Sequence, residues 1–308
     1  MKAVRFHTYG GPDVLKVEEV EVPNPSIGQL RIVVRASGVN PIDLKLRSGH
    51  LHDMFPLLFP AGLGFDAAGI VDAIGDGVVG IAVGDAVFGK GHNTMAEYAI
   101  LHEWALKPDT LSFAEAAGYP VAVETAMRII EGLEVKSGDT MLVSGAAGGV
   151  GSAVLQLARA AGIRTIGTAS EPKHAYLESM GAIPTTYGPG LPIRVARLAP
   201  DGVQAAVDIA GSGVIQDLVT ITGNASKVVS ISDINAADYG VRTLFDESDS
   251  TPALIRSGAL FIAGAFTIPV EQVFKLEDIA DAHILSARGH VTGRLIVIID
   301  EQQSAGES

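Results

Sequence analysis

Short hydrophobic runs separated by glycine and proline fill the first 115 residues of the chain. Apolar segments of this length are typical of β-strands, and the Gly and Pro clusters between them are typical of turns. The predicted strands cover residues 2–6, 15–22, 30–39, 69–73, 86–88 and 96–100. This pattern predicts an all-β module.

From about Val121 the pattern changes to an alternation of apolar strands with longer amphipathic segments, which predicts a parallel sheet. Strands are predicted at residues 140–144, 164–168, 205–209 and 227–232, and helices at 150–161, 172–180 and 248–257. The last segment carries an acidic amphipathic helix around 276–287 and an apolar strand at 294–299. We expect this segment to return to the first module.

Composition and charge narrow the classes of function. At 308 residues and 47% hydrophobic content, the chain is long enough for two domains of about 100–200 residues each. A formal charge of −13 repels phosphate backbones and anionic lipids, so we expect neither a nucleic-acid nor a membrane partner. The chain contains no cysteine and neither a signal-peptide pattern nor a transmembrane run. These features predict a cytoplasmic protein.

A glycine-rich turn joins the strand predicted at 140–144 to the helix predicted at 150–161. The turn reads Gly145-Ala146-Ala147-Gly148-Gly149-Val150-Gly151. Glycines let backbone N–H groups approach a pyrophosphate, and the helix N-terminus adds partial positive charge. Because strand, turn and helix follow in the required order, we predict a dinucleotide site here and not merely a structural turn. We expect Gly148 and Gly151 to be the positions least tolerant of a side chain.

The end of the next strand indicates which dinucleotide binds. NAD-binding sheets usually carry an acidic residue there for the ribose hydroxyls, and this chain has Ser170. Ser170 leaves room for a 2′-phosphate and Lys173 supplies a positive charge, so NADP(H) is the predicted cofactor. Glu171 argues for NAD instead, and Lys173 can also be read as a solvated lysine at a helix start.

The sequence resembles the zinc-free, quinone-oxidoreductase-like branch of the medium-chain dehydrogenase/reductase superfamily over nearly its whole length. The motifs that carry the resemblance are Met1-Lys2-Ala3-Val4-Arg5, Gly10-Gly11-Pro12-Asp13-Val14-Leu15, Gly38-Val39-Asn40-Pro41-Ile42-Asp43, Arg47-Ser48-Gly49, Gly62-Leu63-Gly64-Phe65-Asp66-Ala67-Ala68-Gly69, Glu97-Tyr98-Ala99, Glu124-Thr125-Ala126 and Thr292-Gly293-Arg294. The resemblance implies an α/β fold in which a doubly wound Rossmann sheet is inserted into a GroES-like, β-rich catalytic domain. The implied boundaries are 1–118 for the catalytic domain, 119–255 for the Rossmann domain and 256–308 for the C-terminal return.

The resemblance also implies roles for individual residues. Asn40 and Thr125 would lie near the nicotinamide, and Lys173 and Tyr187 would hold the adenosine 2′-phosphate. Ser232, at the end of a later strand, completes the expected cofactor set. The family further implies a homodimer or homotetramer.

Zinc-dependent members of the superfamily place a Cys at the position of Asn40 and a His at the position of Phe65, and neither ligand is present. The lobe that holds their structural zinc is reduced to residues 89–94. We therefore expect no metal and a hydride transfer that needs no Lewis acid. The His50-x-His52 pair lacks a third ligand and is expected in a loop.

The candidate catalytic residues are Asn40, Asp43 and Lys45. If the acceptor is a quinone or a conjugated enone, Asn40, a backbone N–H or water can stabilise the developing negative charge on its oxygen. Asp43 either orients Asn40 or Lys45 or caps a short helix at 44–48. Lys45 and Leu51 lie where quinone reductases of this branch often have tyrosines near the substrate. This difference argues against quinone as the substrate.

Two other functions fit parts of the sequence. A short-chain dehydrogenase shares the glycine pattern but needs a Tyr-x-x-x-Lys pair, and no tyrosine of this chain has a lysine four residues on. A non-catalytic NADPH sensor or crystallin-like protein could use the same scaffold. Turnover of quinones, alkenals or enones distinguishes an enzyme from a sensor.

Overall fold

The computed structural model describes residues 1–244 and 248–299, and its chain forms two compact units. The first unit contains Met1–Val121, Asp249–Gly264 and the described residues from Ile268 onward. The second contains Ala122–Ser248 and Ala265–Thr267. Parts of the predicted domains, residues 245–247 and 300–308, lie outside the described residues. The second unit begins and ends at Ala122 and Ser248, compared with the predicted boundaries 119 and 255.

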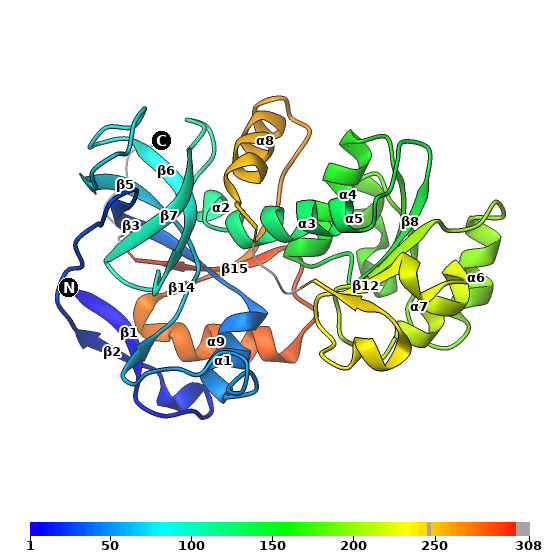
Figure 1. Ribbon diagram of the computed structural model, residues 1–308, viewed down its shortest axis with the longest axis horizontal. Coiled ribbons are helices and arrows are strands. Elements are labelled where there is room, and N and C mark those ends of the chain that lie inside the picture. The colour runs from blue at the N-terminus through cyan, green and yellow to red at the C-terminus, as the bar shows by residue number, and fades with distance from the viewer. Residues whose placement is uncertain (245–247, 300–308) are drawn as a thin grey trace. The chain divides into compact units, whose positions relative to one another are not determined.

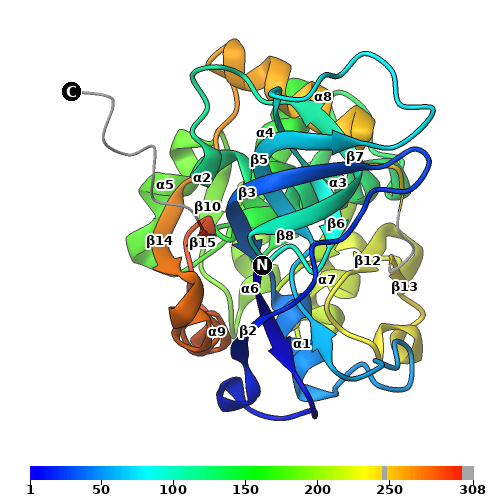
Figure 2. The ribbon, with the colours of Figure 1, turned by 90° about the vertical axis from the view of Figure 1, so that its left-hand side faces the viewer.

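The first unit is built around a six-stranded sheet in the order β14-β15-β3-β5-β6-β7, in which β3 also pairs with β7 (Figure 2). Its strands are β3 (Leu30–Val39), β5 (Asp66–Ile74), β6 (Ala86–His92), β7 (Tyr98–Leu106), β14 (Val270–Lys275) and β15 (Arg294–Ile298). A smaller sheet has the order β2-β1-β4, from Lys16–Glu19, Lys2–Phe6 and Ala61–Gly62. Its α-helices are α1 (Pro41–Ser48), α2 (Phe113–Ala116), α8 (Thr251–Ile262) and α9 (Ile279–Arg288).

β3 is the central strand of this unit because it pairs with β5, β7 and β15, and its burial alternates along its first half. Leu30, Ile32 and Val34 are fully buried, while Arg31 and Val33 between them are partly exposed. The C-terminal strand β15 pairs antiparallel with β3, and this pairing places Leu295 opposite Val39. The C-terminal strand therefore returns to the N-terminal module, as predicted.

The second unit contains a six-stranded, wholly parallel sheet with helices on both sides (Figure 1). The strand order is β10-β9-β8-β11-β12-β13, which in chain order is the 3-2-1-4-5-6 arrangement of doubly wound dinucleotide-binding folds. The strands are β8 (Thr140–Ser144), β9 (Arg164–Thr168), β10 (Ile183–Thr185), β11 (Ala205–Asp208), β12 (Val228–Ser230) and β13 (Arg242–Thr243). The helices are α3 (Pro120–Gly132), α4 (Gly149–Ala160), α5 (His174–Ser179), α6 (Leu191–Leu198) and α7 (Ile215–Thr222). The predicted fold class is confirmed.

Several elements begin and end where the sequence predicts, and others begin or end at different residues. β1, β3, β8 and β9 match their predicted ranges. The helix predicted at 172–180 is divided into a 3-10 turn, Glu171–Lys173, followed by α5, because Pro172 fixes the start of the segment. The helix predicted at 248–257 begins at Thr251 and continues to Ile262.

The helix predicted at 44–48 begins three residues earlier, at Pro41, with Asn40 as its N-cap residue. Proline is favoured in the first turn of a helix because its missing N–H would have no partner there. The predicted start at Leu44 is therefore wrong, but the predicted capping role of Asp43 is confirmed, because its carboxylate accepts the backbone N–H of the N-cap residue Asn40 at 2.8 Å. Asp43 lies within the first turn.

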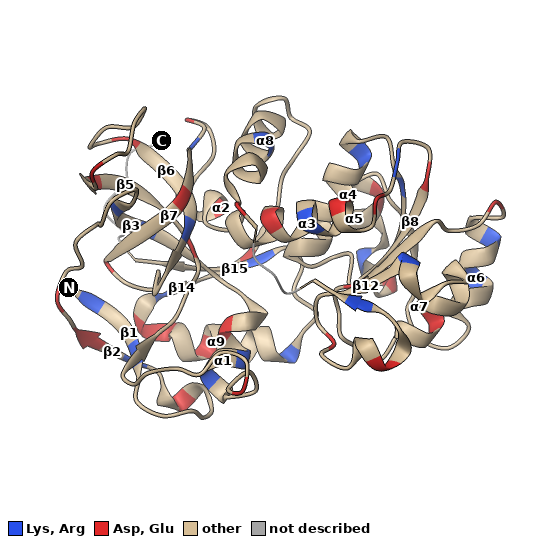
Figure 3. Ribbon diagram, viewed as in Figure 1, with Lys and Arg blue, Asp and Glu red and all other residues tan. Residues whose placement is uncertain are grey.

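Charged residues of both signs are spread over the elements of the structure. Figure 3 shows Lys and Arg interspersed with Asp and Glu along the elements of both units. Among the helices that the structure describes, none is long and apolar enough to cross a membrane.

Candidate functional site

The glycine-rich turn between β8 and α4 has the geometry of an anion-binding helix start. Gly145 has φ +83°, and Gly148 is the N-cap residue of α4. The first intrahelical bond joins the Ser152 N–H to the Gly148 carbonyl at 2.8 Å. The N–H groups of Gly149, Val150 and Gly151 precede this bond in the first turn, where no intrahelical acceptor exists. They and the helix dipole favour a negatively charged group.

Within the protein itself a side chain is excluded at Gly151 but not at Gly148, contrary to the prediction that both positions are the least tolerant of one. A Cβ on Gly151 would lie 2.4 Å from the Gly145 carbonyl oxygen and 2.7 Å from backbone atoms of Ala146. The obstacle is the backbone of the turn itself, where the sequence alone suggested a pyrophosphate or a facing strand. A Cβ on Gly148 would have no protein atom nearer than the Gly145 carbonyl oxygen, at 3.8 Å. The space above Gly148 is therefore open in the protein.

Residues predicted to discriminate between NADP(H) and NAD(H) follow two neighbouring strands. β9 and β10 are parallel and place Thr168 beside Thr185, and the Ala169 N–H donates to the Thr185 carbonyl at 3.0 Å. Ser170 and Lys173 follow β9, and Tyr187 follows β10. Carboxyl ends of adjacent parallel strands meet at one sheet edge. The pairing therefore brings these three residues to the same edge as the glycine-rich turn.

Two more strands of the sheet contribute to this edge. Ser232 follows β12, and its hydroxyl donates to the Ile209 carbonyl, which follows β11. A Cβ on Gly145 would lie 3.1 Å from the Ala210 nitrogen, so the segment after β11 also lies against the glycine-rich turn. Ser232 is thereby placed at the same sheet edge as the glycine-rich turn, whereas Asn40 and Thr125 of the predicted cofactor set lie elsewhere.

Asp208, at the end of β11, is a residue that the sequence reasoning missed. Its carboxylate is fully buried and accepts hydrogen bonds from the Gly211 N–H at 2.9 Å and the Ser230 hydroxyl at 3.0 Å. Burial raises its pKa above the usual value for an aspartate, and these bonds act in the opposite direction. Asp208 fixes the segment after β11 at the sheet edge. An acid ending an otherwise apolar strand was the available signal.

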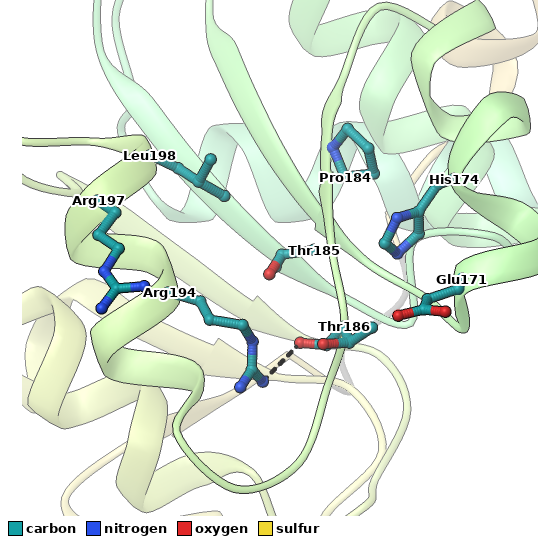
Figure 4. Close-up of a pocket in the computed structure, with 8 residues that line it drawn as sticks. All are labelled: Glu171, His174, Pro184, Thr185, Thr186, Arg194, Arg197 and Leu198. Carbon is teal, nitrogen blue, oxygen red and sulfur yellow. Dashed lines mark hydrogen bonds between the residues drawn. The ribbon is translucent and has the colours of Figure 1, made fainter.

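A shallow pocket of about 310 Å³ lies in the second unit, beside the segments predicted to discriminate between NADP(H) and NAD(H) (Figure 4). Its lining residues are Glu171, His174, Pro184, Thr185, Thr186, Arg194, Arg197 and Leu198. These residues come from the 3-10 turn after β9, the first residue of α5, β10 with Thr186 directly after it, and α6. Three of them are immediate neighbours in sequence of Ser170, Lys173 and Tyr187, so the pocket adjoins the predicted 2′-phosphate residues.

Thr125 lies on α3 and belongs to a separate group of contacts. Its hydroxyl donates to Glu124 at 3.2 Å, and Arg128 donates to Glu124 at 2.8 Å. Arg128 also donates to the Leu244 carbonyl, and the Ser248 hydroxyl donates to Glu124 at 2.8 Å. Thr125 is therefore held in a polar network at the buried side of α3. The described contacts do not join it to the glycine-rich turn.

Asn40 lies at the centre of a buried polar cluster in the first unit. Its side-chain Nδ2 donates to Asp66 Oδ2 at 2.9 Å, and its Oδ1 accepts from a guanidinium nitrogen of Arg294 at 2.8 Å. Arg294 also donates to Asp66. Asn40 is only 1% exposed. These bonds fix the orientation of the amide, and Asp66 takes only one of the two N–H groups on its nitrogen.

Asp43 supports the backbone at Asn40 and does not orient its amide. The Asp43 carboxylate accepts the backbone N–H of Asn40 at 2.8 Å and that of Gly64 at 3.1 Å. Burial raises the pKa of Asp43 to about 7 in spite of these two donors. The carboxyl group links the start of α1 to the segment that precedes β5.

Asp66 and Arg294 form a buried ion pair that the sequence reasoning did not assign. Both side chains are almost completely inaccessible, and burial raises the pKa of Asp66 while the Arg294 charge acts in the opposite direction. A Cβ on Gly38 would lie 2.7 Å from Arg294 and 2.8 Å from Asp66, so β3 passes close to the pair. The motif ending in Arg294 contributed to the resemblance, but the partner lies 228 residues away.

The remaining candidates of the first unit have structural neighbours of their own. Lys45 is half-buried on α1, and Leu51 is part of the hydrophobic core. His50 is bonded to Ser48, and His52 to the Tyr9 hydroxyl. No group of three or more possible metal-ligating His, Cys, Asp or Glu side chains occurs within residues 1–244 and 248–299.

Comparison with known families and proteins agrees with the fold. Residues 26–119 match the alcohol dehydrogenase GroES-like domain, and residues 192–297 match the zinc-binding dehydrogenase family. The structure of a quinone oxidoreductase from Coxiella burnetii is 30% identical, with a TM-score of 0.82, and the match covers 97% of this chain and 99% of that one. The fold and the site thus define a medium-chain dehydrogenase/reductase.

Curated relatives are more similar over shorter segments. The quinone oxidoreductase of Sus scrofa is 41% identical over 175 residues, which are 55% of this chain and 53% of that protein. The chloroplastic NADPH-dependent alkenal/one oxidoreductase of Arabidopsis thaliana is 38% identical over 59% of this chain and 51% of that protein. The chain thus spans about half the length of these relatives. It belongs to the quinone-oxidoreductase-like branch of the medium-chain dehydrogenase/reductase superfamily.

Proposed function

We propose that this protein is an NADPH-dependent oxidoreductase that transfers a hydride to a quinone or an α,β-unsaturated carbonyl compound without zinc. The observation that carries the proposal is the glycine-rich turn at the carboxyl edge of the β10-β9-β8-β11-β12-β13 sheet. There, open space above Gly148 meets the first-turn N–H groups of α4. Membership of the family excludes the short-chain dehydrogenase alternative.

The residues of the sheet edge fit a dinucleotide phosphate. Gly145, Gly148, Gly149, Val150 and Gly151 would receive the pyrophosphate through backbone N–H groups. Ser170 leaves space for the 2′-phosphate, and Lys173 and Tyr187 offer it a cation and a hydroxyl. The NADPH dependence that names the Arabidopsis relative supports the same cofactor.

The chain's own contribution to catalysis would be orientation and charge stabilisation, since the nicotinamide supplies the hydride. Asn40 is the proposed hydrogen-bond donor to the acceptor oxygen, through the N–H that Asp66 does not take. Asp66 and Arg294 are positioning residues that hold this amide in one orientation before the substrate arrives. Solvent supplies the proton, so no strong side-chain acid is required. Thr125 would contact the nicotinamide from α3.

Zinc independence rests on the ligand set. Asn40 and Phe65 occupy the positions of two family zinc ligands, and the whole sequence lacks cysteine. Asn40 is committed to Asp66 and Arg294, and the Phe65 ring packs edge-on against His92 with centroids 5.7 Å apart. Elemental analysis of purified protein is expected to find no stoichiometric zinc. One tightly held zinc per chain, with activity lost on chelation, would contradict this part of the proposal.

Quinones and enones are both proposed substrate classes because relatives of both kinds match this chain. The absence of the family tyrosines at Lys45 and Leu51 favours enones and alkenals. Oxidation of NADPH should be followed with a panel of quinones, 2-alkenals and enones. Tight NADPH binding without turnover of any member would indicate the non-catalytic sensor instead.

The cofactor assignment has a direct test. Wild-type protein is expected to bind NADPH more tightly than NADH, and Lys173→Ala should weaken NADPH binding alone, because only NADPH carries the extra phosphate. Lys227→Ala, at a lysine outside the predicted phosphate set, serves as the control for general charge. Equal affinities of wild type for the two cofactors would overturn the assignment and make Glu171 the expected ribose ligand.

The family also supports proposals about organisation. We propose a catalytic domain formed by residues 1–118 and 256–308, a cofactor domain formed by 119–255, and a homodimer or homotetramer. Light scattering on the purified protein would measure the number of subunits.

A further inference from the structure

One arginine side chain donates to a run of four consecutive backbone carbonyls after β10. The two terminal nitrogens of Arg194, on α6, donate to the carbonyls of Thr186, Tyr187, Gly188 and Pro189 at 2.7–3.3 Å. Figure 4 shows the side chain extending from α6 toward the segment after β10, with its bond to Thr186. A single side chain thus holds the whole connection between an edge strand and the next helix.

Apart from Arg194, the connection contains a backbone bond from the Leu191 N–H to the Gly188 carbonyl at 3.2 Å. Gly188 and Gly190 both have positive φ, at +83° and +80°, which glycine adopts without strain but does not enforce. The Tyr187 side chain is 50% exposed, so packing holds it only in part. Its direction therefore depends on the backbone on either side, and Arg194 bonds that backbone at Tyr187 itself and at both neighbours.

The shape of the guanidinium matters here, and its charge alone is not sufficient. Arginine presents five N–H donors in a rigid plane, whereas lysine presents three donors from one rotating point. A lysine at position 194 keeps the positive charge but cannot reach four carbonyls at once. The two side chains therefore separate positioning from a direct electrostatic effect on a bound phosphate.

We propose that Arg194 is a positioning residue that sets the preference for NADP(H) over NAD(H) by fixing the loop that carries Tyr187. The inference rests on the proposed function, in which Tyr187 contacts the 2′-phosphate. Arg194 itself faces carbonyl oxygens, so it acts through Tyr187 and not as a phosphate ligand. NAD(H), which lacks the 2′-phosphate, gains nothing from this arrangement.

The experiment measures the dissociation constants of NADPH and NADH for wild type, Arg194→Ala, Arg194→Lys and the control Arg197→Ala. Arg197 lies one turn further along α6, is exposed and lines the same pocket. Both Arg194 variants should weaken NADPH binding about tenfold, the size of one hydrogen bond to a charged group, and leave NADH within twofold. Arg197→Ala should change neither. Thermal melting verifies that each variant is folded. If Arg194→Ala does not fold, Arg194→Lys alone tests the inference.

Three results with the Arg194 single variants would overturn the inference and leave the proposed NADPH-dependent function standing. The first is equal weakening of NADPH and NADH binding, which indicates a merely structural role. The second is wild-type cofactor binding by Arg194→Lys, which indicates a direct effect of charge. The third is unchanged NADPH binding by Arg194→Ala. Failure of the proposed function looks different, because wild type itself would then bind NADPH no better than NADH, and both ideas would fall. In a Tyr187→Ala background, Arg194→Ala should cause no further loss, since interacting positions are not additive. Full additivity would refute the inference.

Discussion

Substitutions at two glycines of the β8–α4 turn should separate cofactor binding from folding. At Gly151 the new methyl would lie 2.4 Å from one backbone oxygen and 2.7 Å from two backbone carbons, none of which can rotate away. Overpacking of this kind costs roughly 1–3 kcal/mol. For a protein of this size, that cost lowers the melting temperature by several degrees.

Gly148 presents the opposite case. Its backbone, with φ −77° and ψ 175°, suits any residue, and the nearest atom to a new Cβ is 3.8 Å away. Gly148→Ala should change the free energy of unfolding by no more than about 0.5 kcal/mol. The larger Gly148→Val fills the space proposed for the pyrophosphate, so NADPH affinity should fall at least tenfold, or about 1.4 kcal/mol.

Fluorescence titration with NADPH and thermal melting, applied to each variant, measure the two effects separately. Normal NADPH affinity in a folded Gly148→Val protein would refute the placement of the pyrophosphate and the oxidoreductase proposal with it. A Gly151→Ala protein as stable as wild type would refute the steric reasoning about the turn.

Three further predictions concern buried ionisable side chains. Because its pKa is raised to about 7, Asp43 should favour folding at low pH and lose this contribution as pH rises from about 4 to 7, by up to about 1.4 kcal/mol per pH unit. Urea unfolding at several pH values measures how the free energy of unfolding depends on pH, and Asp43→Asn should remove the fall between pH 4 and 7. Burial lowers the pKa of His283 to about 3, so this residue makes the free energy of unfolding rise with pH below 6.5. Replacing His283 should remove that rise. Arg294→Met should destabilise the protein by about 3–5 kcal/mol because it leaves Asp66 buried without its partner. Adding Asp66→Asn to this variant should recover much of the lost stability. An Arg294→Met protein as stable as wild type would show that the ion pair does not contribute to stability.

The glycine-rich turn could be predicted from sequence because all its determinants are local. Apolar residues define β8, the glycines allow the turn, and α4 starts directly after it, all within residues 140–160. The 3-2-1-4-5-6 strand order then follows from the general behaviour of strand–helix alternation. Ser170, Lys173 and Tyr187 reach the same edge for the same reason.

Short elements and long-range side-chain contacts were not predictable in this way. β10 has only three residues, which is too short to display a clear period. Arg194 was missed because nothing in its own sequence neighbourhood indicates that it bonds the preceding loop. Asp208 and Arg294 were missed because their significance depends on burial, which a single sequence does not report for a charged residue.

The two candidate sites therefore differ in what maintains them. The cofactor edge is formed chiefly by backbone groups, so it depends on glycines and on strand order and tolerates many side chains nearby. The Asn40 cluster is formed by side chains from three distant segments, and its net charge is balanced only while Arg294 faces Asp66. Because an unpaired buried charge is far more costly than a lost surface contact, substitutions in this cluster should affect folding before they affect chemistry. Activity measurements on Asn40 or Asp66 variants are for that reason informative only alongside their stability.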